Sequence, residues 1–133
     1  NNMQKDFDNW NNLKKKLEKR EKFPSFKERE IWWISIGTNN GDELCGKSEL
    51  FSRPVLILKK FNNHFFFGIP LSSVQKDNKY YFNFEFKGKE QSAIMCQAKP
   101  ISAKRLSTMI GKVDSELFNA IKKKTSKILF NLS

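Results

Sequence analysis

The hydrophobic positions in the middle of the chain form two short runs separated by polar turn residues. The first run, 54–58, directly follows Arg53, and the second, 65–71, directly precedes Ser72 and Ser73. Two apolar runs joined by a polar turn predict a buried β-hairpin. In an antiparallel pair the start of one strand lies beside the end of the other, so we expect Arg53 close to Ser72.

Further strands are predicted on both sides of this hairpin. Residues 29–37 are rich in aromatic and β-branched side chains, which favour a strand. Residues 80–86 alternate with period two, which predicts a strand whose phenylalanine face is buried. Gly88 marks a tight turn, and residues 92–97 are predicted to return as the next strand.

The C-terminal part is predicted to end in a helix. Residues 102–106 favour a short helical turn, and residues 109–112 a brief strand. Asp114 is a good N-cap, since its carboxylate can accept a hydrogen bond from the first helical turn. Val113 and Phe118 have the spacing of a hydrophobic staple across the helix start. Short strands, tight turns and a terminal helix predict a mainly β domain over residues 28–133, a small antiparallel β-barrel with added helices.

Residues 1–27 are predicted to be a separate basic amphipathic extension, helical over residues 3–22. Its narrow apolar stripe consists of Phe7, Trp10, Leu13 and Leu17. Such a helix can dock on the barrel surface by that stripe, which we favour. It can also act as a basic arm that holds RNA phosphates or a partner.

The charge of the chain predicts an anionic partner. The formal net charge is +11 and the sequence pI is about 9.8. Nucleic acid is favoured over an acidic protein or a membrane surface. The alternative is that the lysines serve solubility alone.

The cysteines and the absence of targeting patterns predict a reduced, cytoplasmic setting. No apolar run is long enough to span a bilayer, and no signal-peptide pattern is present. The two cysteines are too few for a disulfide scaffold and lack metal-ligand spacing. We expect Cys96 to be a small buried strand residue and Cys45, in a polar loop, to be incidental.

Several kinds of catalytic site are excluded by the residues present. The single histidine, His64, falls in a turn, and a two-histidine ribonuclease mechanism needs one imidazole for each proton transfer. Zinc clusters and glycine-rich phosphate loops are absent, so no metal or cofactor is expected. An arginine beside two hydroxyls remains, namely Arg53, Ser72 and Ser73. Because a guanidinium grips phosphate oxygens in a bidentate way, this strand end is a candidate phosphate site.

Several blocks of the chain resemble the MazF/PemK-like toxins in order and spacing, over roughly residues 29–125. The most specific are the arginine–proline strand start and the proline-x-hydroxyl-hydroxyl strand end. The matching blocks are 29–33, 41–43, 53–58, 69–73, 97–106 and 110–113.

The resemblance implies a small SH3-like antiparallel barrel that forms a homodimer and cleaves single-stranded RNA without a metal. It also implies the toxin half of a type II toxin–antitoxin pair, neutralised by a protein antitoxin. Arg53 matches the catalytic arginine of the family, Ser72 stands where a catalytic threonine is usual, and Ser73 follows it. Glu43 matches a loop glutamate that helps shape the site. The candidate RNA-binding residues are Trp33, Phe51, Lys47 and Lys76.

The chemistry of RNA agrees with this interpretation, because RNA carries a nucleophile, the 2′-hydroxyl, beside its own phosphate. Arg53 is expected to stabilise charge on the phosphate and Ser72 to hydrogen-bond one of its oxygens. The products would be a 2′,3′-cyclic phosphate and a 5′-hydroxyl. The alternative is a non-catalytic barrel that binds nucleic acid or protein, including a gyrase-inhibiting toxin of related fold.

Overall fold

The computed structural model describes residues 23–35 and 52–131 of the 133-residue chain. The helix predicted over residues 3–22 and the polar loop around Cys45 lie outside these ranges.

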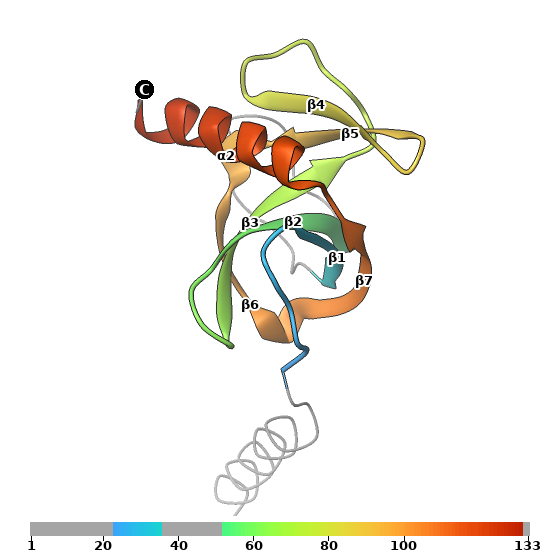
Figure 1. The fold of residues 1–133 in the computed structure, drawn as a ribbon, viewed down its shortest axis with the longest axis vertical. Helices are drawn as coiled ribbons and strands as arrows, with labels where there is room; N and C mark the ends of the chain where they lie inside the picture. The colour runs from blue at the N-terminus through green and yellow to red at the C-terminus, as the bar shows by residue number, and fades with distance from the viewer. Residues whose placement is uncertain (1–22, 36–51, 132–133) are drawn as a thin grey trace, which may run out of the picture.

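The described residues form a mainly β fold, a seven-stranded antiparallel sheet with a C-terminal helix (Figure 1). The strand order is β4-β5-β3-β2-β1-β7, and β6 pairs with β3. No pairing among the described strands joins β4 to β7, so the sheet is not closed, but the mainly β fold class is confirmed. The elements in chain order are β1 (Glu30–Ser35), β2 (Ser52–Lys60), β3 (Phe65–Ser72), β4 (Tyr81–Phe86), β5 (Lys89–Ile94), the 3-10 turn η1 (Met95–Gln97), β6 (Lys99–Ser102), the 3-10 turn η2 (Ala103–Arg105), β7 (Leu106–Lys112) and α2 (Ser115–Phe130).

The predicted central hairpin is confirmed, and its two strands have both faces buried. Val55 pairs with Pro70, and Leu56 pairs with Ile69. Successive side chains point to opposite faces of a strand, so β2 and β3 each contribute to two clusters. The inner face of the sheet carries Val55, Ile57 and Phe66, packed with residues of β1, β6 and β7. The helix face carries Leu56, Leu58, Ile69 and Leu71, and α2 covers it.

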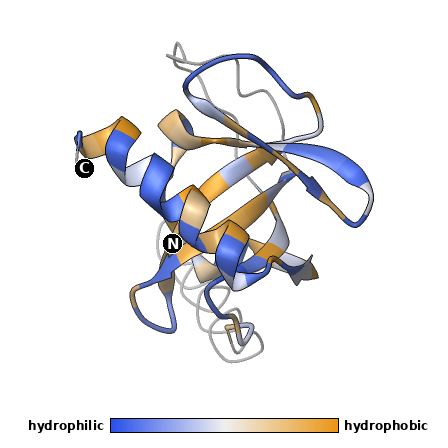
Figure 2. Ribbon diagram, turned by 45° about the horizontal axis from the view of Figure 1, so that its top comes forward, coloured by the Kyte–Doolittle hydropathy of each residue, from blue (hydrophilic) through white to orange (hydrophobic). Residues whose placement is uncertain are grey.

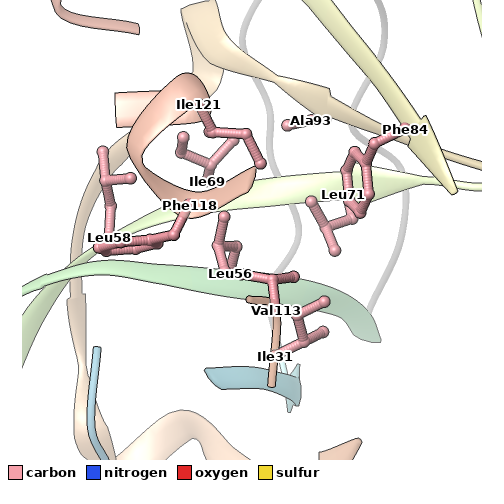
Figure 3. Close-up of a cluster of buried hydrophobic side chains, with 10 residues drawn as sticks. All are labelled: Ile31, Leu56, Leu58, Ile69, Leu71, Phe84, Ala93, Val113, Phe118 and Ile121. Carbon is pink, nitrogen blue, oxygen red and sulfur yellow. The ribbon is translucent and has the colours of Figure 1, made fainter. Parts of the chain in front are cut away.

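Helix α2 packs on the helix face through its apolar side. Phe118 and Ile121 lie over Leu56, Leu58 and Ile69 (Figure 3). The rest of the helix alternates between hydrophilic and hydrophobic positions (Figure 2), and its lysines lie mainly on the exposed side.

The predicted start of α2 is also confirmed. Asp114 is the N-cap, and its Oδ1 accepts a hydrogen bond from the backbone N–H of Leu117 at 2.7 Å. Val113 and Phe118 are buried in the same cluster, as a hydrophobic staple requires.

We expect Asp114→Ala to destabilise the protein by about 1 kcal/mol, because it removes the acceptor for the Leu117 N–H. The free energy of unfolding from urea denaturation measures this loss. Asp114→Asn is the control and should stay near wild type, since asparagine caps as well as aspartate. Equal losses in the two variants would contradict a capping role.

The strand predicted over residues 92–97 is shifted toward the N-terminus. Lys87 and Gly88 have φ values of 53° and 74°, as a two-residue hairpin turn requires, so β5 starts directly after them. It ends at Ile94, because β4 offers no partner beyond Tyr81. The chain then forms the 3-10 turn η1. The backbone N–H of Met95, the first residue of this turn, donates to the Tyr80 carbonyl at 2.9 Å.

The prediction for Cys96 is wrong. Cys96 lies in η1 rather than in a strand, is only half-buried, and is disulfide-bonded. A sulfur engaged in a disulfide is not the reduced thiol that was expected. Cys45, the other cysteine of the chain, lies outside the described residues.

Strand β6 was not predicted. It pairs with residues 65–68 of β3, and its four residues are too few to show a period.

Candidate functional site

Arg53 and Ser72 lie at the same end of the central hairpin. The last pair that joins β2 and β3 at this end is Val55 with Pro70, and the alternation along each strand puts Arg53 and Ser72 on the same face as that pair. Arg53 also pairs with Ile34 of β1, which belongs to the inner-face cluster. Both Arg53 and Ser72 therefore share the inner face, at the edge where the apolar residues end. The apolar pattern predicted that both residues lie at this end of the hairpin.

The guanidinium of Arg53 is held in place by the neighbouring turn η1. Arg53 is only 6% exposed, and its Nη1 donates to Oε1 of Gln97 at 3.2 Å. A charge in such a poorly solvated position interacts more strongly with an anion than the same charge in water. Sequence reasoning included Gln97 in a matching block but did not assign it to the site. The fold shows that its amide orients Arg53.

Ser72 presents its hydroxyl as a donor. It is half-buried, and its Oγ accepts the backbone N–H of Val74 at 3.1 Å. A hydroxyl has one proton and two lone pairs, so an oxygen that accepts here still has its proton to donate. Ser73, the next residue, is exposed just beyond the end of β3.

A second serine, Ser92, lies beside Ser72 on β5. The two are direct strand partners, so their side chains share the inner face. Ser92 is 0% exposed, and its hydroxyl has no hydrogen-bond partner among the described residues. Sequence analysis missed this residue. The available signal is a polar residue at the head of the apolar segment 93–95.

The predicted RNA-binding residues are only partly described. Trp33 is 41% exposed, but its neighbour Ile34 pairs with Arg53, so Trp33 points to the opposite face from Arg53. Lys76 is exposed after β3, with its Nζ 5.3 Å from the centroid of the Tyr81 ring. The other predicted site residues, Glu43, Lys47 and Phe51, lie outside the described residues.

Elsewhere in the part of the chain that the structure describes, the histidine and an apolar groove lie away from the predicted site residues. His64 is a turn residue, as predicted: its N–H donates to Oδ1 of Asn62 at 2.7 Å, and its ring lies edge-on to Phe23. An apolar groove of about 330 Å³ between the hairpin and the end of α2 contains none of the predicted site residues. Within residues 23–35 and 52–131, no group of three His, Cys, Asp or Glu side chains is placed to hold a metal ion.

Comparison with known proteins identifies the family. The sequence profile of the PemK-like, MazF-like toxins of type II toxin–antitoxin systems matches residues 27–129. The chain belongs to this family. Membership implies a cognate antitoxin as partner. No curated protein matches the chain. No helix in the described ranges is both long and apolar enough to cross a membrane.

The fold agrees with a solved structure of this PemK/MazF-like family. The chain is similar to the Mycobacterium tuberculosis toxin MazF-mt6, with 13% sequence identity and a TM-score of 0.59. The similarity covers 79% of this chain and 99% of that toxin. At this identity the likeness establishes the shared fold.

Proposed function

We propose that this member of the PemK/MazF-like toxins is a metal-independent endoribonuclease that cleaves single-stranded RNA at a specific short sequence. The observation that carries the proposal is the buried Arg53 at the same hairpin end and on the same face as Ser72, with its guanidinium oriented by Gln97. A protein that only binds RNA has no need of a hydroxyl donor and an oriented, poorly solvated guanidinium at one strand end.

The reaction uses the nucleophile that RNA itself carries. The 2′-oxygen attacks the adjacent phosphorus, the bond from phosphorus to the 5′-oxygen breaks, and a 2′,3′-cyclic phosphate and a 5′-hydroxyl result. One proton leaves the 2′-hydroxyl and one reaches the departing 5′-oxygen. In the transition state negative charge accumulates on the non-bridging phosphate oxygens, which is where preorganised donors act.

Arg53 and Ser72 are suited to these oxygens. Arg53 stays protonated at neutral pH, so its role is electrostatic stabilisation rather than general base catalysis. The Ser72 hydroxyl, already accepting from Val74, donates its proton to a phosphate oxygen. The family resemblance adds Ser73 and Glu43 to the proposed site.

RNA binding and assembly complete the proposal. The net charge of +11 favours attraction of the phosphate backbone, and Lys76 lies in the segment that follows Ser72. The aromatic residues Trp33, which is exposed, and Phe51 are proposed to stack on bases, and Lys47 is proposed as a further RNA-binding residue. We also propose a homodimer, as the family resemblance implies.

The purified protein is expected to cut a sequence-diverse pool of single-stranded RNA in the presence of EDTA. End-group analysis of the fragments should show 2′,3′-cyclic phosphates and 5′-hydroxyls. The matched control is an oligonucleotide with a single 2′-deoxy nucleotide at the cleaved position, which should resist cleavage because it lacks the nucleophile. Absence of cleavage, loss of cleavage in EDTA, or cutting of the 2′-deoxy substrate would contradict the proposal.

A further inference from the structure

The buried hydroxyl of Ser92 needs an explanation. Buried polar groups in folded proteins are nearly always hydrogen-bonded. Ser92 is 0% exposed, and no described residue accepts from or donates to its hydroxyl. If Ser92 served packing alone, alanine or valine would suit the position better.

Ser92 has two direct strand partners, and Ser72 is the one that belongs to the proposed site. Across β4, Asn83 pairs with Ser92, is exposed, and donates its side-chain Nδ2 away from the proposed site, to the Lys76 carbonyl at 3.0 Å. Across β3, Ser72 is the direct partner. Directly opposed residues have Cβ atoms about 4.5–5.5 Å apart, a distance at which serine hydroxyls hydrogen-bond across strands. Oγ of Ser72 has a second lone pair beyond the one used by Val74.

We propose that Ser92 is a positioning residue of the cleavage site. This inference rests on the proposed endoribonuclease function. When Ser72 donates its proton to a phosphate oxygen, the Ser92 hydroxyl donates to Oγ of Ser72 and fixes its rotamer. Serine has no γ-methyl to restrict χ1, as a threonine would have. The Ser92 hydroxyl restricts the Ser72 side chain through a hydrogen bond. A threonine would restrict its own side chain through steric contacts of its γ-methyl.

The first test is Ser92→Ala in the full-length protein. We expect kcat for RNA cleavage to fall roughly 5- to 10-fold, the scale of one hydrogen bond. KM should stay the same, since Ser92 does not touch RNA. Tm should not fall, because the hydroxyl removed makes no hydrogen bond with the described residues. The control is Ser107→Ala, whose exposed hydroxyl donates to the Trp33 carbonyl, and which should keep the wild-type kcat.

A double-mutant cycle shows whether Ser92 acts through Ser72. In a Ser72→Ala background, Ser92→Ala should cause no further loss of kcat, because the group it positions is gone. Ser72→Thr should restore kcat in the Ser92→Ala protein, because the threonine methyl restricts χ1.

The outcomes separate this inference from the function it rests on. A wild-type protein that cuts no RNA overturns both. If the wild type cuts and Ser72→Ala impairs it, three results overturn the role of Ser92 alone. The first is a wild-type kcat in Ser92→Ala. The second is a full further loss of kcat when Ser92→Ala is added to Ser72→Ala. The third is a lowered Tm of Ser92→Ala with unchanged kcat.

Discussion

Arg53→Ala is expected to lower kcat for RNA cleavage by on the order of 10³-fold, the cost of removing a preorganised transition-state donor. Arg53 is the buried cation of the strand end, and its orientation depends on the 3.2 Å hydrogen bond to Gln97. Alanine removes both the charge and the donors directed at the developing phosphate charge. Initial rates of cyclic-phosphate formation measure the effect, with far-UV circular dichroism as a check on folding.

Two variants make this experiment decisive. Arg53→Lys keeps the positive charge but loses the planar fork of donors, so its rate should fall between wild type and Arg53→Ala. Arg105→Ala removes an exposed arginine that donates to the Ser35 carbonyl, and it should cleave at the wild-type rate. Wild-type cleavage by a folded Arg53→Ala protein would exclude Arg53 from the reaction.

Phe66→Ala is expected to destabilise the protein by about 3–5 kcal/mol, the usual cost of removing a large aromatic side chain from a core. Phe66 is 0% exposed, and its ring centroid lies 5.5 Å from that of Phe26. Gly68 leaves room for this ring, since a Cβ there would lie 2.8 Å from Cε2 of Phe66. Equilibrium urea denaturation gives the free energy of unfolding.

The neighbouring residue provides the matched control. Phe65 is 49% exposed and points to the other side of β3. Phe65→Ala should therefore change the free energy of unfolding by less than about 1 kcal/mol. Similar losses in the two variants would mean that the inner-face cluster is not the core of the domain.

Strong local patterns predicted most of the elements. The apolar runs around Asn62 and Asn63 predicted the β2–β3 hairpin, because burial of both strands requires continuous apolar residues and the turn requires polar ones. The same hairpin geometry predicted Arg53 beside Ser72. Asp114 predicted the start of α2, because capping depends on residues only three positions apart.

Predictions failed where a non-local partner decides the structure. The apolar residues 93–96 favour a strand that continues to Cys96, yet the chain leaves the sheet after Ile94, where the pairing with β4 ends at Tyr81. Cys96 consequently lies in a turn, and its disulfide depends on a contact that spacing alone cannot predict.

By itself the sequence determined the hairpin, the N-cap of α2, the location of Arg53 and Ser72 at one end of that hairpin, and the family resemblance. These follow from periodicity, turn chemistry and short motifs, which act between residues close in the chain. Only the tertiary structure decided that Gln97 orients Arg53, across 44 positions of sequence, and that Ser92 lies opposite Ser72. Such contacts depend on strand register and on where each strand finds its partner, and a shift of one residue would turn these side chains to the other face.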